Sequence, residues 1–489
     1  MVVCTPCAQV RIGHLELRAK VLSSDEVEEI DRATIQVLSD VGVSIASERA
    51  CQLLEKAGAR VDHRTGIATI PENLVRKSVS SARQRTVELF DRSGANSIRL
   101  EGKRTYNISG FDATYTLDSE TGERRPSTKH DVEEFTRLAD ALPNIHVVGT
   151  QAIPQDVPAR SAELHAVEAI LNNTSKHCHF SLSDAEIARA VFEMAKHACG
   201  GRDLSSKPPI TSMASPTSPL RWEKNAIETL IETASTGVPL HIISQPIAGI
   251  TAPITLAGVL LLQNVETLTG LVVAQLLRPG TPVIYGYVPT VLDMREASAA
   301  IASPEGAIMR IASAQVAKHY GLPCLSAGPD TDAHVHDEQT AWEKAITGLA
   351  IYLGGADLML NPGMFSSGMI VSYEQLVIDN EILGYLDRVV KGMRANSETL
   401  VVDLVRKVGH GGQFLKEAHT LKEFKSEYWI PDISSRAAFG RWTHRGGQDI
   451  VKSAREKARK LLGEHHPPEL FASTKEGLTR IVRDFETRA

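Results

Sequence analysis

Eight short β-rich runs, each followed by a segment with helical spacing of apolar residues, constrain the fold of this chain more than any other feature. The runs lie at residues 106–112, 145–151, 176–181, 209–215, 239–246, 282–288, 323–328 and 357–363. Strands and helices that alternate in this way form parallel sheets. Eight consecutive units predict a closed (β/α)8 barrel rather than an open doubly wound sheet, because eight parallel strands close naturally.

The helical segment after the seventh run has a strong apolar pattern. Apolar residues recur there in steps of three and four, at Trp342, Ala345, Ile346, Leu349, Ala350 and Leu353. This spacing predicts a buried stripe that faces the sheet.

The 489 residues exceed the size at which one core usually stops growing, so extensions to the barrel are expected. We predict an N-terminal helical extension with a small hairpin over residues 1–104, with the hairpin at "RVDHRTGIATIP". The catalytic barrel then covers residues 105–394, and a C-terminal helical cap covers residues 395–489. "HGGQ" at 410–413 is more typical of a helix end than of a phosphate cradle.

Composition excludes several classes of protein. A net charge of -6 without a long Lys/Arg run argues against a nucleic-acid platform. No signal peptide and no run of 18 uninterrupted apolar residues is present, so we expect a cytoplasmic protein. The cysteines are too scattered for a disulfide framework, and "CTPC" at the N-terminus lies in an irregular tail where no redox role is expected; they are Cys4, Cys7, Cys51, Cys178, Cys199 and Cys324.

Barrel active sites lie where the strands end, so the residues there are the candidates for function. No glycine-rich nucleotide motif follows any run, which argues against a nucleotide cofactor. The polar and aromatic residues at the expected strand ends are Phe111, Asp112, Gln151, His177, His179, Ser212, Ser215, Ser244, Gln245, Tyr285, Tyr287, Asp332, His334, Asn361 and Phe365.

Two His-x-His pairs raise the question of a metal site. His177 and His179 share one face of a strand, and His334 and His336 lie in "TDAHVHDEQTAWEKA" among acidic residues. Such groups suit a divalent cation, as in a metal-dependent barrel hydrolase. No further strand-end ligands complete either set, so we expect hydrogen-bonded barrel histidines and no metal.

Other candidates also have structural alternatives. Tyr285 and Tyr287 share a face and could be barrel packing or the walls of an aromatic pocket. Asp112 could pair with a basic neighbour or take part in the chemistry.

Long blocks of the chain, in one order, resemble the trimethylamine methyltransferase family of corrinoid-dependent barrel enzymes. They include "LSSDEVEEIDRATIQVLSDVGV", "TLDSETGERRPSTKHDVEEFTRLADALPNI", "YGYVPTVLDMREASAAIASPEGAIM", "TDAHVHDEQTAWEKA", "SYEQLVIDNEIL" and "VGHGGQFLKEAHTL". The resemblance implies methyl transfer to Co(I) of a corrinoid (cobalamin) protein, which would be the partner. A homo-oligomer without a tightly bound cofactor is expected, and the corrinoid protein should dock where the strands end.

The family includes members that contain pyrrolysine and members that lack it. In the former, pyrrolysine follows a Thr-Asp pair after the seventh strand; Thr331 and Asp332 match that pair, which places His334 at the pyrrolysine position. The chain therefore resembles the pyrrolysine-lacking branch, whose characterised members demethylate quaternary amines such as glycine betaine. A tertiary methylamine is the alternative substrate, and a non-catalytic binder of amine or corrinoid protein is the alternative class.

A quaternary ammonium leaves as a neutral amine, and cobalt is the nucleophile, so the protein has to orient one methyl group and exclude water. Rings that could form a cation–π cage are Tyr106, Phe111, Tyr285, Tyr287 and Phe365. His334, with Gln245 or Asn361, could donate to a betaine carboxylate, and Asp112 and His179 complete the expected substrate site. We expect His334 to point into the barrel, with His334 and Asp332 as the catalytic residues and with Asp332 or Asp337 fixing the loop.

Overall fold

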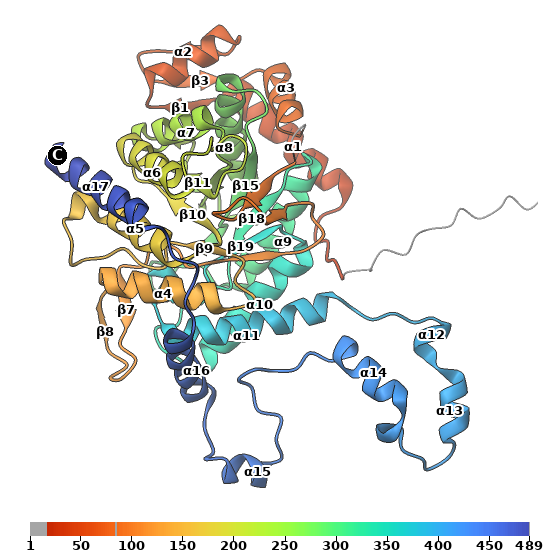
Figure 1. Ribbon diagram of the computed structural model, residues 1–489. Helices are drawn as coiled ribbons and strands as arrows, with labels where there is room; N and C mark the ends of the chain where they lie inside the picture. Colours follow the sequence, from red (N-terminus) through yellow and green to blue (C-terminus); the bar gives the residue numbers. More distant parts are fainter. Residues whose placement is uncertain (1–16, 84–85, 489) are drawn as a thin grey trace, which may run out of the picture.

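Eight parallel strands form a closed barrel at the centre of the molecule (Figure 1). The structure is a computed structural model that describes residues 17–83 and 86–488. Each strand lies within one of the eight predicted runs, which confirms the fold class. In barrel order by sequence they are β6 (Tyr106–Ser109), β9 (Val147–Gly149), β10 (His177–Ser181), β11 (Ile210–Ala214), β13 (Leu240–Ser244), β15 (Val283–Tyr287), β18 (Cys324–Ala327) and β19 (Leu358–Leu360).

A helix follows each strand and packs outside the barrel. Side chains at Thr128, Asp184, Ser303, Asp337 and Ser372 accept backbone N–H groups at the starts of five of these helices. The eight helices are α4 (Lys129–Ala141), α5 (Ala162–Asn173), α6 (Ala185–Ala198), α7 (Lys224–Thr236), α8 (Leu256–Leu277), α9 (Pro304–His319), α10 (Glu338–Gly354) and α11 (Tyr373–Val390).

Helix α8 is long and apolar enough to cross a membrane by length and composition alone, but 72% of its most hydrophobic window is buried. It packs against α1 (Ser24–Asp40), α3 (Glu72–Arg83) and α7. Its buried Asn264 donates to Thr34 and Tyr320. These contacts make α8 a core helix of the barrel.

The apolar stripe predicted on α10 is only partly present: Ala350 is buried and Leu349 and Leu353 pack against the core, but two residues nearer the start of the helix are exposed. Trp342 is 55% exposed and Ile346 is 54% exposed. The helix instead buries Lys344 and Thr347, which bond to the loop after β18 and to α11. Polar contacts fix the orientation of α10, and apolar spacing does not reveal them.

The N-terminal extension packs on one side of the barrel. It contains α1, β1 (Val43–Ile45), α2 (Glu48–Lys56), β2 (Arg60–Asp62), β3 (Ile67–Thr69) and α3. The predicted hairpin is confirmed, because β2 and β3 pair in antiparallel fashion. Strand β1 also pairs with β12 (Arg221–Trp222), which joins the extension to the barrel.

An unpredicted hairpin closes the end of the barrel where the strands begin, which we call the floor. It is formed by β4 (Glu88–Phe90) and β5 (Ser97–Arg99). Val87, Leu89 and Leu100 pack there against inward-facing barrel residues such as Ile108 and Leu325.

The opposite end, where the strands finish, is the mouth. Two small sheets frame it. One contains β7 (Tyr115–Leu117), β8 (Arg124–Pro126), β20 (Met364–Phe365) and β21 (Ile370–Val371), and the other contains β14 (Ile247–Ala248), β16 (Thr290–Asp293) and β17 (Ser298–Ala300).

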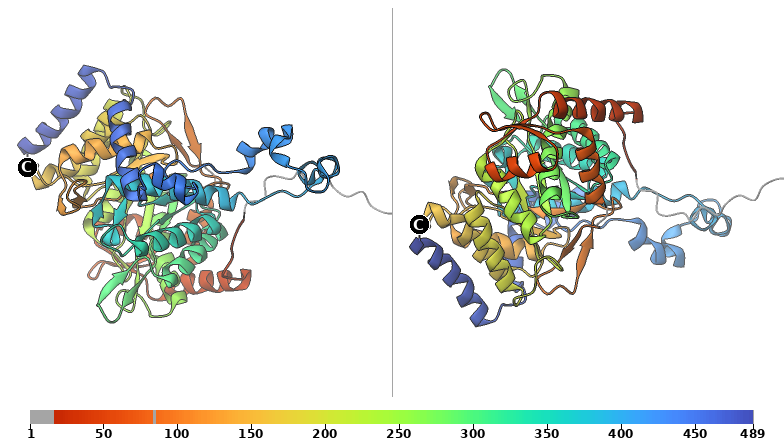
Figure 2. Two further views of the ribbon diagram at one scale, coloured as in Figure 1. Left: turned by 90° about the horizontal axis from the view of Figure 1, so that it is seen from below. Right: turned by 90° about the horizontal axis from the view of Figure 1, so that it is seen from above.

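The C-terminal region does not form one cap. Within the described part of this region, α16 (Ile450–Glu464) and α17 (Ala472–Arg488) are the helices that pack extensively on the barrel helices. The preceding helices project away from the body (Figures 1 and 2). They are α12 (Ser397–Leu400), α13 (Val402–Val408), α14 (Ala418–Glu427) and α15 (Phe439–His444). Gly409 follows the last residue of α13, in line with the helix end predicted at "HGGQ".

Four of the six cysteines lie in the described part of the chain, at Cys51, Cys178, Cys199 and Cys324, and all four are free thiols. Cys4 and Cys7 lie outside the described residues, so the structure does not address the "CTPC" motif.

Candidate active site

Two buried oxygen atoms without hydrogen-bond donors lie next to β6 and β9 at the mouth. They are Asp112 Oδ1 and Gln151 Oε1. The two segments are joined by backbone bonds from Asp112 N–H to Thr150 O, 2.7 Å, and from Ala113 N–H to Gln151 O, 3.1 Å. Gly110 permits this arrangement, because a Cβ there would lie 1.5 Å from Gln151 Oε1.

Asp112 holds a proton at neutral pH. Burial, and then the neighbouring Glu163, raise the pKa of its carboxyl to about 8, although a hydrogen bond with Ser181 acts in the other direction. Its backbone is in the left-handed region, with φ of 51°, which is uncommon for a residue other than glycine. A strained, neutral carboxyl at a barrel mouth is a candidate for function.

Aromatic side chains contribute unequally to the mouth. Phe111 packs against the apolar cluster inside the barrel and against the core between the strands and the helices. Its N–H donates to Met364 Sδ at 3.0 Å. Phe365 is fully buried and contacts the His336 ring edge-on, with centroids 4.7 Å apart. Tyr106 lies at the floor end instead, because it is the first residue of β6.

Tyr285 and Tyr287 share a face as predicted, but that face is the outer one. Tyr285 Oη donates to Asn264 on α8 at 3.0 Å, and Tyr287 Oη lies 3.9 Å from Cys324 Sγ. Both rings are completely buried in the layer between strands and helices. The prediction that they form an aromatic cage is therefore corrected: they are packing residues.

His177 and His179 lie inside the barrel below the mouth. His177 Nδ1 lies 2.8 Å from Phe90 O, and His179 Nδ1 lies 3.0 Å from Thr211 Oγ1. The His179 ring stacks on His241, with centroids 4.4 Å apart. Burial lowers the pKa of His177 to about 4 and that of His179 to about 3, so both are neutral. Among residues 17–83 and 86–488, no three potential ligands come together as a metal site would require.

Two aspartates fix the loop after β18. Asp332 accepts the backbone N–H groups of Ile301 and Ala302 at 3.2 and 3.1 Å. Asp337 caps α10 by accepting the N–H of Thr340 at 3.0 Å. Both therefore occupy the loop-fixing positions expected of them.

His334 does not point into the barrel. Its side chain is exposed, and Nδ1 lies 2.8 Å from Ser366 Oγ. It lines a groove of about 780 Å³ beside Asp332 and Trp342, on the outer edge of the mouth. The predicted inward orientation is wrong because the loop is attached to the β19 loop, through the N–H of Ser366 to Ala333 O at 2.8 Å.

The remaining predicted residues are spread out. Asn361 donates to Asp330 at 2.9 Å, and its own oxygen lacks a donor. Gln245 is exposed, and Ser212 and Ser244 face the helices, where they bond to Thr233 and Glu266.

Comparisons with known proteins identify the family. The sequence profile of "Trimethylamine methyltransferase (MTTB)" matches residues 8–487. A trimethylamine methyltransferase of Desulfitobacterium hafniense is 35% identical over 95% of this chain and 93% of its own length. A glycine betaine methyltransferase of the same species is 32% identical over 94% of this chain and 95% of its own. The chain belongs to the trimethylamine methyltransferase family.

The fold agrees with that of a solved methyltransferase. The monomethylamine methyltransferase of Methanosarcina barkeri superposes with a TM-score of 0.54 over 93% of this chain and 90% of that chain. Sequence identity is 13%, so this likeness concerns the barrel alone.

Three polar residues near the mouth of this family member were not predicted from the sequence. Glu163, Ser181 and His241 adjoin residues that were singled out. Ser181 could have been found from alternation, because inward-facing residues on β10 recur every two positions after His177. Glu163 carries no such signal, because it lies on a helix that only the fold brings to the mouth.

Proposed function

We propose that this family member transfers a methyl group from a quaternary amine, such as glycine betaine, to Co(I) of a corrinoid protein. The observation that carries the proposal is the pair of buried oxygens without donors, Asp112 Oδ1 and Gln151 Oε1, on two segments that hydrogen-bond to each other at the mouth, with the aromatic residue Phe111 next to Asp112 in the chain. A quaternary ammonium has no N–H to donate. It is held by negative charge, by oxygen atoms that contact its polarised methyl groups, and by aromatic faces.

Asp112 supplies the counter-ion. A cation next to this carboxyl favours its ionised form, so substrate binding releases the proton. Because the positive charge disappears as the methyl group leaves, a counter-ion whose ionisation is costly avoids excessive stabilisation of the bound substrate.

The chain's own residues orient and shield the substrate. Cys178 and Cys324 are no alternative nucleophiles, because they face the helices and burial raises the pKa of each thiol to about 12. Cobalt of the corrinoid would supply the nucleophile. Gln151 and Phe111 then hold the ammonium head so that one methyl group faces the opening, in a setting with little water.

The identity of the amine rests on one sequence position. Both a trimethylamine and a glycine betaine methyltransferase are similar to this chain, so overall identity does not separate them. His334 at the expected pyrrolysine position supports a quaternary amine. A tertiary methylamine is the second candidate, because the relative with 35% identity carries the name trimethylamine methyltransferase.

The corrinoid protein would dock on the rim of the mouth. Exposed apolar side chains occur in the segments that follow β13, β15, β18 and β19, and two of them, Trp342 and Ile346, line one groove. They are Ile250, Ile254, Met294, Val335, Trp342, Ile346 and Met369, which we call the rim. Apolar groups exposed together mark interaction sites. His334 lines the groove of about 780 Å³ beside Asp332 and Trp342, which we call the rim groove. We therefore propose that His334 contacts the corrinoid protein rather than a substrate carboxylate.

A spectroscopic assay tests the proposal. The purified protein is incubated with free Co(I) cobalamin and glycine betaine, tetramethylammonium, choline or trimethylamine, and formation of methylcobalamin is followed. At least one quaternary amine should react and trimethylamine should not. Reaction of trimethylamine alone would favour the second candidate, and no reaction with any methylated amine, with or without a corrinoid protein, would refute the function.

A further inference from the structure

A long segment after the barrel has no core of its own. Between Val390 and Ala454 no residue is buried. Within this segment, residues 393–427 form what we call the arm, which contains α12, α13 and α14. These helices have 4, 7 and 10 residues. Isolated helices shorter than about 12 residues are marginal in water, so the arm needs a surface to pack against.

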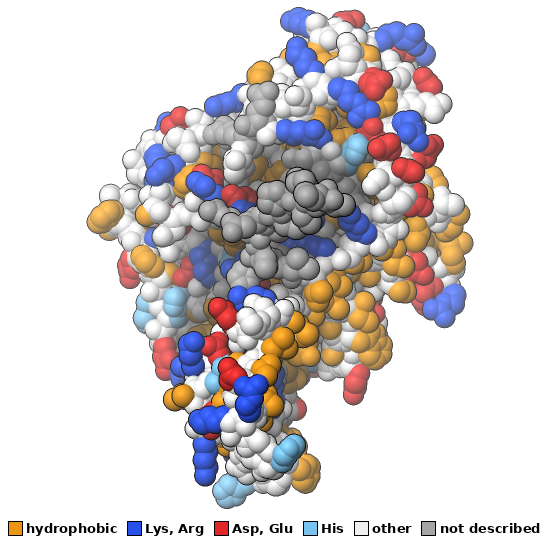
Figure 3. All heavy atoms as spheres, turned by 90° about the vertical axis from the view of Figure 1, so that its right-hand side faces the viewer, with side chains coloured by type: hydrophobic (Ala, Val, Ile, Leu, Met, Phe, Trp, Pro, Cys, Tyr) orange, Lys and Arg blue, Asp and Glu red, His pale blue; other side chains and the backbone are white. Residues whose placement is uncertain are grey.

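The arm exposes apolar side chains along its length. Leu415 is 82% exposed and Leu421 is 79% exposed. The others are Met393, Leu400, Val402, Val405 and Phe414. Viewed from the arm's side, hydrophobic side chains run together over the lower part of the molecule (Figure 3).

Polar contacts attach the arm to the rest of the chain at its C-terminal end. There Arg388 of α11 donates to Glu427 O at 2.9 Å, and the N–H of Tyr428 donates to Phe424 O at 3.0 Å. Other hydrogen bonds and ion pairs of the arm are internal, such as Lys407 to Glu417, 2.6 Å, and Thr420 Oγ1 to Phe414 O, 2.6 Å. Its exposed apolar side chains and its short helices indicate a surface that another molecule covers.

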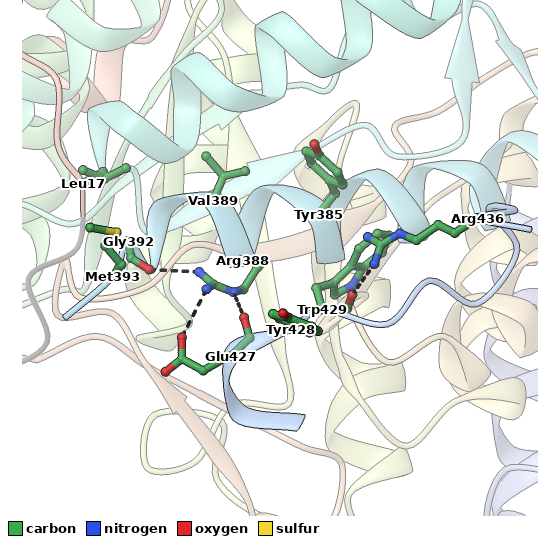
Figure 4. A pocket seen from close by; sticks show the side chains of 10 residues that line it. All are labelled: Leu17, Tyr385, Arg388, Val389, Gly392, Met393, Glu427, Tyr428, Trp429 and Arg436. Carbon is green, nitrogen blue, oxygen red and sulfur yellow. Dashed lines mark hydrogen bonds and ion pairs between the residues drawn. The ribbon is translucent and has the colours of Figure 1, made fainter. Parts of the chain in front are cut away.

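A groove of about 680 Å³ lies at the base of the arm (Figure 4). One wall is α11, with Tyr385 and Val389, and the other is the returning chain, with Tyr428 and Trp429. Glu381 holds this returning chain by accepting three successive backbone N–H groups, at Asp432, Ile433 and Ser434. The groove is thus preformed and largely apolar, and Tyr385 and Val389 stay exposed in it.

The position of arm and groove separates them from the mouth. Helix α11 begins at the mouth with Tyr373 and ends at the floor, where the N–H of Leu17 donates to Val390 O at 2.8 Å. A corrinoid protein that sits on the rim is therefore at the other end of the barrel. The surface that covers the arm has to come from elsewhere.

We propose that the arm of one copy of this chain packs into the groove of a second copy, and that the second copy's arm does the same in return. Each chain carries both the apolar arm and the apolar groove, which is what a two-fold interface requires. A stable interface buries roughly 800 Å² on each partner, and a reciprocal exchange of arms forms the arm–groove contact twice in one dimer. The arm then gains the packing that its short helices lack.

Sedimentation velocity of the full chain, without substrate or corrinoid protein, tests this interface independently of the proposed activity. The wild-type mass should be that of a dimer or a larger even assembly. Leu421→Asp with Val405→Asp in the arm, or Val389→Asp in the groove, should halve it with an unchanged circular dichroism spectrum. Val41→Asp, an exposed apolar residue of the N-terminal extension, is the matched control and should leave the mass unchanged.

A mixing experiment shows whether the arm meets the groove. An arm variant keeps an intact groove and a groove variant keeps an intact arm, so an equimolar mixture should recover part of the dimer. A monomeric wild type, an unchanged mass in the arm variant, or a mixture that stays monomeric would overturn the proposal.

Discussion

Lys344 of α10 and Asp379 of α11 form an ion pair of 2.8 Å in which neither side chain is exposed to solvent. Lys344 Nζ also donates to Pro329 O at 2.9 Å, and Asp379 also accepts from the N–H of Gly363 and from Gln375 Nε2 at 2.5 and 2.7 Å. The pair therefore holds the loops after β18 and β19 against two helices. Burying two charges is costly, and these extra hydrogen bonds offset the cost.

Lys344→Met should lower the free energy of unfolding by about 3 to 5 kcal/mol, because it leaves the Asp379 carboxylate buried without its partner. Urea unfolding measures this change. Adding Asp379→Leu should recover part of the loss. Lys103→Met, which breaks an exposed pair with Glu101, is the control and should change stability by less than about 1 kcal/mol. A Lys344→Met protein as stable as wild type would show that the pair contributes nothing.

Substrate binding should depend on the protonation of Asp112. Because burial raises its pKa to about 8, a quaternary amine has to displace a proton below that pH. Affinity should therefore rise about tenfold per pH unit from pH 6 to 8 and then level off, since one proton is released per cation bound. Isothermal titration calorimetry in two buffers of different ionisation enthalpy measures both the affinity and the proton.

Asp112→Asn should remove this pH dependence and weaken binding at pH 9. Asp118→Asn, on the exposed β7–β8 turn, is the matched control and should keep it. Wild-type affinity that is constant from pH 6 to 9 would exclude Asp112 as the counter-ion.

Most of the barrel could be predicted from sequence because its strands are buried on both faces and read as continuous apolar runs. The hairpin of β4 and β5 could not, since it gains its stability from contacts with barrel residues far along the chain, such as Leu325. Helix α10 shows the same limit. Its orientation depends on Lys344 and Asp379, which are distant in sequence.

The site was predicted less well than the fold. The sequence correctly predicted that Phe111 and Asp112 lie at a strand end. It did not predict which face of β15 carries Tyr285 and Tyr287. Tyr285 and Tyr287 were known to share a face, and hydrophobicity could not show which one, because both faces of β15 are buried. The direction of His334 depends on a bond to Ser366 in another loop, for which a single sequence has no periodic signal.

We expect the protein to act without a bound metal ion. His177 and His179 bond through Nδ1 to Phe90 O and Thr211 Oγ1, and no third ligand joins them in the described chain. Elemental analysis should give well under one zinc per chain, and dialysis against EDTA should leave methyl transfer to free cobalamin unchanged. Stoichiometric zinc that is lost in His179→Ala together with activity would support a barrel hydrolase instead.

The rim should govern transfer to the corrinoid protein without affecting the chemistry at the mouth. Trp342 lies in the rim groove and is half exposed, so Trp342→Ala removes apolar area that a docked partner would cover. Losing such an anchor costs about 2 kcal/mol or more, which corresponds to a rise in KM for the corrinoid protein of about thirtyfold. His334→Ala should act in the same direction but more weakly, because the imidazole is exposed and keeps one bond to Ser366.

Methylation of free Co(I) cobalamin by both variants should equal that of wild type, since neither side chain contacts the Asp112 site. Ile67→Ala, an exposed residue of the N-terminal extension, provides the control and should leave both reactions unchanged. If Trp342→Ala instead slows the reaction with free cobalamin as much as that with the protein partner, the rim belongs to the substrate site and the docking surface lies elsewhere.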